Sequence, residues 1–297
     1  MPYIPLHVHS TNSPGIGMMT ASEIVERASF LGMQSIALTD QWNTNGHFEL
    51  CKKAGATGIK PVLGAEVRHL SLTGHDGAYH LTLLAESNTG YANLTRLVSM
   101  HYDKEGPPHV TAEELAGLNE GIIALSGCIR GEVNQAVLHG NLAMEREAVE
   151  RLLEIYGEGR LYLEIMTHNH EREQLVLDKT ILLSKKLGIP MVVTNNDRFI
   201  SKDDAAYYEV LRLLAGNRKK EEDSDTLPEY FLKSRKDLEP YFYFLEEALE
   251  ASSKRAGGLL TQLSSAAEEG SEAAQPGDDA VDAEFEEVDG EDDPKSD

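Results

Sequence analysis

The chain of 297 residues contains little cysteine and no long apolar run. Its two cysteines, Cys51 and Cys128, are too few for the disulfide framework of a small secreted domain, so we expect a reduced, cytoplasmic protein. No basic and apolar leader opens the chain, and no apolar stretch approaches the length of a membrane span. We therefore expect neither secretion nor contact with a membrane.

Basic residues are also scarce, since 27 Lys and Arg stand against 50 Asp and Glu, for a net charge of −23. This charge argues against a general nucleic-acid-binding surface. The negative charge is unevenly distributed along the chain. Residues 266–297 hold 14 Asp and Glu against one Lys, so they carry −13 of the net charge. Large apolar side chains are rare from residue 257 onward, so we expect residues 257–297 to form a disordered acidic tail.

Seven short β-rich runs alternate with helical segments in the first 215 residues, which is typical of βαβ units and a mostly parallel sheet. The runs are 3–9, 35–40, 60–67, 79–86, 121–127, 161–166 and 190–195. Since no G-x-G-x-x-G follows the first run, we expect an α/β barrel rather than a dinucleotide-binding fold. The predicted units are a barrel at 1–215, a charged linker and helix at 216–256, and the tail at 257–297.

The stretch PLHVHS, at residues 5–10, places His7 and His9 on one face of the first run, because strand side chains alternate. On this spacing alone, a polar pair that meets water is the simpler interpretation. Chemistry in parallel barrels lies at the carboxyl ends of the strands, however, and there the sequence adds Glu66, His80 and Cys128. Imidazole, carboxylate and thiolate together suit zinc, manganese or iron.

The three candidate ligands that follow the histidine pair could each have a structural role instead of binding a metal. Glu66 could be a solvated strand end, His80 a core histidine, and Cys128 a small buried hydrophobic residue. We expect Asp40 to cap the following helix rather than to bind a metal. We expect the other histidines to be exposed to solvent; they are His47, His69, His75, His101, His109, His139, His168 and His170.

In their order along the chain, these stretches resemble the PHP (polymerase and histidinol phosphatase) domain at the N-terminus of bacterial replicative DNA polymerase III alpha subunits. The resemblance covers roughly residues 1–245 and rests on PLHVHS, LGMQSIALTDQWNTNGHFEL, GIKPVLGAEV, HLTLLAESNTGYANLTRLVS, LNEGIIALSG, LEIMTHNHEREQ, GIPMVVTNNDRFISKDDAAYYEVL and EYFLKS. It implies a distorted (β/α)7 TIM-like barrel (the PHP fold), a site for up to three metal ions and, in active members, phosphoester hydrolysis or proofreading of a 3′ DNA end.

The resemblance places family metal ligands on His7, His9, Glu66, His80 and Cys128. Four other expected ligands are missing, and in their places stand Ile16, Gln41, Asn196 and Arg198. Three of those lost ligands together hold one of the family's ions, so the resemblance implies that this subsite is lost and that one or two divalent ions remain. The weaker candidates for ligands are Asp40, Asn196 and Asp197.

We therefore expect at most weak metal-dependent phosphoesterase or 3′–5′ exonuclease activity, with DNA 3′ ends or polymerase and proofreading subunits as partners. Two alternatives stay open: a free-standing small-molecule phosphoesterase of the histidinol-phosphatase kind, and a non-catalytic docking scaffold. The polymerase regions of the family have no counterpart after about residue 245, so we do not expect this chain to polymerise DNA by itself.

The acidic end of the chain carries a second resemblance. DDAVDAEFEEVDGEDD, at residues 278–293, is similar to the C-terminal tail of bacterial heat-shock chaperones of the DnaK family. The alternative is an ordinary acidic tail of low complexity. Because the chaperone's nucleotide-binding and peptide-binding domains have no match in this sequence, we expect no chaperone activity from it.

Overall fold

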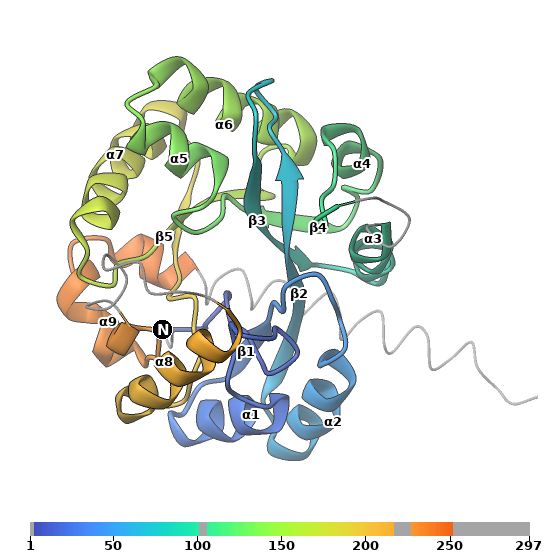
Figure 1. Ribbon diagram of the computed structural model, residues 1–297, viewed down its shortest axis with the longest axis vertical. Helices are drawn as coiled ribbons and strands as arrows, with labels where there is room; N and C mark the ends of the chain where they lie inside the picture. Colours follow the sequence, from blue (N-terminus) through green and yellow to red (C-terminus); the bar gives the residue numbers. More distant parts are fainter. Residues whose placement is uncertain (1–2, 101–105, 217–226, 252–297) are drawn as a thin grey trace, which may run out of the picture.

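The computed structural model describes residues 3–100, 106–216 and 227–251 (Figure 1). Residues 217–226 of the predicted charged linker and the predicted tail, with its chaperone-like stretch, lie outside them. Six strands form one curled sheet in sequence order: β1 (Ser35–Leu38), β2 (Lys60–Leu70), β3 (Ala78–Ala85), β4 (Ile122–Leu125), β5 (Leu161–Ile165) and β6 (Met191–Val193). They match six of the seven predicted runs and confirm the α/β class.

Helices surround this sheet on the outside (Figure 1). They are α1 (Ala21–Phe30), α2 (His47–Thr57), α3 (Asn88–Ser99), α4 (Ala112–Gly117), α5 (Glu132–Leu138), α6 (Leu142–Tyr156), α7 (Glu171–Leu187), α8 (Ala205–Leu214) and α9 (Arg235–Phe242), with 3-10 turns η2 (Lys202–Asp204) and η4 (Leu227–Glu229). Local sequence sets several of their ends. A capping box of Thr20 and Glu23 begins α1, and Gly188 ends α7 in the left-handed conformation.

β3 runs antiparallel to both of its neighbours, whereas the other three strand pairs are parallel. The sequence analysis, which expected a mostly parallel sheet, did not predict the reversed direction of this strand. Residues 71–77, which join β2 to β3, are too few for the crossover that parallel neighbours require. As a result the amino end of β3 lies beside the carboxyl end of β2, and Arg68 pairs with His80.

The first predicted run is not a regular strand, but it lies between the two edges of the sheet. On one side, the backbone N–H groups of His9 and Asp197 donate to the carbonyls of Asp197 and His7, both at 2.9 Å. On the other side, the N–H of Thr39, just after β1, donates to the carbonyl of Val8 at 2.8 Å. This segment therefore takes the seventh position of the distorted barrel, and the pair of histidines lies inside it.

The described part of the predicted linker and helix packs against the barrel. Leu238 and Phe242 of α9 share a buried apolar cluster with Tyr3, Val193 and Leu177. The chain after α8 therefore returns to the strands, next to the segment that carries the histidine pair. The domain boundaries given above stay predictions.

Candidate metal centre

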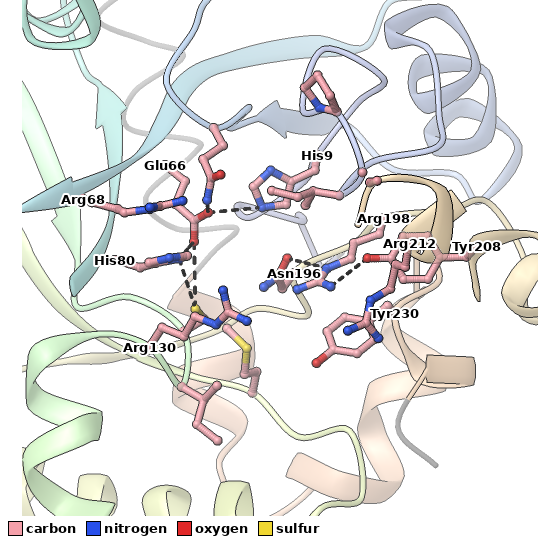
Figure 2. A pocket seen from close by; sticks show the side chains of 18 of the residues that line it. His9, Glu66, Arg68, His80, Arg130, Asn196, Arg198, Tyr208, Arg212 and Tyr230 are labelled. Atoms are coloured by element: carbon pink, nitrogen blue, oxygen red, sulfur yellow. Dashed lines mark hydrogen bonds and ion pairs between the residues drawn. The ribbon is translucent and has the colours of Figure 1, made fainter. Parts of the chain in front are cut away.

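The five predicted ligands lie together in two overlapping groups. His7, His9 and Glu66 form one group, and Glu66, His80 and Cys128 form the other. In each group the ligand atoms lie within 4.8 Å of one another, and all five residues are buried. Figure 2 shows His9, Glu66 and His80 turned toward one another at the side of a pocket.

The first group has the spacing that a tetrahedral ion requires. The Nε2 atoms of His7 and His9 are 3.2 Å apart, and they lie 3.5 and 3.8 Å from the two oxygens of Glu66. Two nitrogens that each bind a tetrahedral zinc at about 2.0–2.1 Å are themselves about 3.3 Å apart. The donors and their spacing therefore fit a divalent ion.

The second group depends on the antiparallel course of β3, which carries His80 to the carboxyl end of β2. Nδ1 of His80 donates to Oε1 of Glu66 at 2.7 Å, and Sγ of Cys128 lies 3.7 Å from that nitrogen. Burial and the charge of Glu66 raise the pKa of the Cys128 thiol. Gln41 donates to the other oxygen of Glu66 at 2.9 Å. Glu66 thus belongs to both groups and is placed to join two ions.

The charges of the centre depend on one another. Burial alone would raise the pKa of Glu66, but His80 and His7 lower it well below its usual value. Burial alone would lower the pKa of His7, but Glu164 and Glu66 raise it to about 10. Burial dominates at His9 and lowers its pKa to about 3. A cation would compete with the proton on His7, so metal binding should weaken in acid.

Glu164, on β5, is the polar residue of this centre that the sequence analysis missed. Its Oε1 accepts hydrogen bonds from Nδ1 of His7 and from Oγ1 of Thr194, both at 2.7 Å. A buried carboxylate in this position fixes the imidazole ring so that Nε2 faces Glu66, where it could hold an ion. The sequence feature that could have pointed to Glu164 is its position as the single charged residue inside the apolar run LYLEIM.

Asp40, a weaker candidate, is engaged elsewhere, and it does not cap a helix. Its carboxylate accepts hydrogen bonds from the backbone N–H and Oγ of Ser10 at 2.7 and 2.6 Å, and from Oγ of Ser13 at 2.6 Å. Asp40 therefore holds the loop that follows the histidine pair. The sequence could not show this, because the two serines lie 27 and 30 positions earlier in the chain.

Asn196 and Asp197 also lie outside both groups. Asn196 has a left-handed φ of 51°, and its side-chain oxygen accepts from Nε of Arg198 at 3.3 Å. Oδ1 of Asp197 accepts from Asn195 at 2.7 Å, while burial raises the pKa of Asp197 to about 7. Neither residue contacts Glu66 within the described chain, so their role as ligands stays a prediction.

Arg198, which replaces one expected histidine ligand, lines the same pocket as Glu66. Its guanidinium donates to the hydroxyl of Tyr208 at 2.7 Å and lies over the ring of Tyr230 at 4.2 Å. A guanidinium is always charged and offers no lone pair to a metal. This side of the pocket therefore does not suit a cation, in keeping with the implied loss of one metal subsite.

Three histidines that we expected at the surface are buried instead, with His47, His69 and His168 exposed by 2%, 1% and 0%. Each of these imidazoles makes at least one hydrogen bond inside the protein, although Nδ1 of His47 has no partner among the described residues. Nε2 of His47 donates to the carbonyl of Gly64, and Nδ1 of His168 donates to Glu173. His101 lies outside the described residues.

Comparisons with known proteins show the family to which this chain belongs. A family model described as the PHP domain matches residues 5–168. This chain belongs to the PHP domain family. Its PHP domain is similar to DNA polymerase III subunit alpha from Borreliella burgdorferi, with 30% identity over 263 residues, and from Escherichia coli K12, with 35% identity over 212 residues. An error-prone DNA polymerase from Symbiobacterium thermophilum is 35% identical over 229 residues.

These alignments cover 84%, 70% and 71% of the present chain but only 23%, 18% and 20% of the three relatives. The chain thus spans about a fifth of the length of the curated relatives it matches. A candidate metal-dependent phosphoesterase from Bifidobacterium adolescentis has a related structure, with a TM-score of 0.46 and 14% identity over 65% of this chain and 86% of that one. Among the helices of the described residues, none has the length and apolar character to cross a membrane.

Proposed function

We propose that this PHP domain binds one or two divalent ions and hydrolyses phosphoester bonds weakly, with a DNA 3′ end as its substrate. The observation that supports this most is the pair of buried donor groups that share Glu66. Zinc, manganese and iron all suit imidazole, carboxylate and thiolate ligands, so the ion is one of these. The similarity to replicative polymerase subunits favours DNA over a small metabolite.

Ions of this kind activate water and polarise a phosphoryl oxygen when they are bound. The chain's own residues prepare the site for them. Glu164 orients His7, Gln41 donates a hydrogen bond to Glu66, and Glu66 supplies negative charge to both groups. Because one ligand trio of the family is replaced, we expect slow turnover.

A docking scaffold is the second candidate. The relatives are polymerase subunits, and a barrel with a reduced metal site could serve to bind a polymerase or proofreading subunit. Its signature would be partner binding that does not change when the metal is removed. A small-molecule phosphatase would instead prefer histidinol phosphate to single-stranded DNA in a hydrolysis assay.

The deciding experiment measures metal in purified protein by elemental analysis, in the wild type and in Glu66→Gln, His80→Ala and His7→Ala. We expect fewer than three ions per chain. Glu66→Gln should lose more metal than either histidine variant, because it removes negative charge from both groups. It should also abolish hydrolysis of a 3′-terminal phosphodiester in manganese and in zinc.

His139→Ala is the matched control, since this exposed histidine follows α5 outside both groups. Circular dichroism checks that each variant is folded. Three stoichiometric ions in the wild type, or unchanged metal in Glu66→Gln, would contradict the proposal.

A further inference from the structure

Four arginines line the pocket beside the metal centre, although basic residues are scarce in this chain. They come from four places in the fold: β2, the loop after β4, the segment after β6, and α8. The four residues are Arg68, Arg130, Arg198 and Arg212. In Figure 2, Arg198 and Arg212 lie with Tyr208 and Tyr230, and Arg68 and Arg130 lie on the side of His80.

Three of these four arginines have no carboxylate partner in the described part of the chain. Among the ion pairs of the described residues, none includes Arg68, Arg130 or Arg198. Nε of Arg68 is buried and has no hydrogen-bond partner there. The two carboxylates that line the pocket, Glu66 and Glu173, are bonded to histidines. Arg68, Arg130 and Arg198 therefore retain donors and charge for an anion.

Arg198 is held in place by neutral groups only. The hydroxyl of Tyr208 and the ring of Tyr230 fix its guanidinium, as described above. It is close enough to the metal centre that its charge contributes to lowering the pKa of His9. A fixed guanidinium binds phosphate oxygens through two parallel hydrogen bonds and loses little side-chain entropy in doing so.

We propose that the arginine side of this pocket binds the phosphate group of a nucleotide ester without any metal ion. Arg198 then supplies positive charge where the family's lost ligand trio would have held a cation. The pocket measures about 350 Å³, at the small end of ligand sites, so it suits a single terminal phosphate with its nucleoside rather than a duplex. This inference rests on the proposed function, from which it takes the class of substrate, a phosphoester. It adds that the arginines recognise the phosphate group of that substrate.

The test is calorimetric titration of the whole chain with inorganic phosphate in excess EDTA. We expect binding, and we expect Arg130→Gln and Arg198→Gln to weaken it at least about tenfold each, the usual effect of losing a charged hydrogen bond. Arg130 is exposed, and its side chain makes no hydrogen bond or ion pair with the described residues, so Arg130→Gln remains informative even if Arg198→Gln fails to fold. The matched control is Arg151→Gln on the outer face of α6, where the arginine is paired with Glu154.

A mononucleotide 3′-phosphate and a 3′-phosphorylated tetranucleotide then identify the source of the phosphate. Tighter binding of the tetranucleotide supports a DNA end, and equal binding supports a small phosphate ester. Absence of phosphate binding in EDTA, or equal affinity in wild type and Arg130→Gln, would overturn the inference and leave the metal proposal standing. If protein purified without EDTA already contains no metal, phosphate binding would still support the inference while the metal proposal fails.

Discussion

Two buried imidazoles in this protein are paired with carboxylates that set their orientation. Glu164 holds His7, and Glu173 holds His168 in the same way, at 2.7 and 2.8 Å. The two pairs differ in what the other ring nitrogen meets. Nε2 of His7 faces Glu66 and the candidate ion site, whereas Nε2 of His168 donates to the carbonyl of Asn195 at 2.8 Å.

This difference predicts the effect of Glu164→Gln. The variant keeps the size of the side chain but removes the charge behind His7, so we expect metal affinity to fall about 10- to 100-fold. Affinity is measured by titrating metal-free protein with zinc or manganese in competition with a chelator. Glu173→Gln makes the same change at a histidine outside the ligand groups and should leave the affinity close to that of the wild type. Equal losses in both variants would show that Glu164 acts only through stability.

The sequence alone predicted the five candidate ligands, because their residue types and positions match a family pattern. It could not predict Glu164 or the burial of His168. Both depend on which side chains from distant segments meet inside the barrel, 157 positions apart for His7 and Glu164. The neighbours of a residue decide whether a polar group is a ligand, a support or a surface group.

At the scale of elements, the pattern of strands and helices predicted the α/β class and the location of six strands. It did not predict that β3 is antiparallel, because an apolar run has the same appearance in either direction. The length of the connection between β2 and β3 indicated the antiparallel direction, since residues 71–77 leave no room for a crossover helix. The reversal matters because it brings His80 to the end of β2 that carries Glu66.

The turn after β4 places Cys128 beside His80, and Gly127 makes this possible. Its φ is 89°, and a Cβ there would collide with the backbone carbonyl of His80. We expect Gly127→Ala to lower the free energy of unfolding by at least about 2 kcal/mol, since backbone strain adds to a steric clash. The second ligand group should also bind metal more weakly. Urea unfolding and metal titration measure the two effects.

Gly140→Ala is the control for this prediction. Gly140 has a φ of 65°, but a Cβ at that position meets nothing within 4 Å. Its substitution adds strain without a clash and should cost only about 1 kcal/mol. If the two variants lost the same stability, the contact between the turn and β3 would not matter.

At the scale of the whole molecule, the candidate metal ligands come together only when the barrel is closed. The N-terminal segment with His7 and His9 bonds to residues after both edge strands, and Glu66, His80 and Cys128 come from other parts of the sheet. An unfolded chain scatters these ligands. A divalent ion should therefore bind the folded state far better than the unfolded state and stabilise the entire fold.

This linkage predicts a rise in melting temperature when metal is added. With free zinc or manganese about 100-fold above Kd, the stabilisation is about 2.7 kcal/mol, which corresponds to roughly 5–10 °C for a domain of this size. Differential scanning calorimetry of EDTA-treated protein, with and without added ion, measures the shift. Glu66→Gln should lose most of it, because both ligand groups contain Glu66. Zinc that bound unfolded Cys or His would reduce the shift in both proteins, so manganese is the sharper probe. A shift of equal size in wild type and Glu66→Gln would place the ion elsewhere on the molecule, since the variant leaves the remaining surface unchanged.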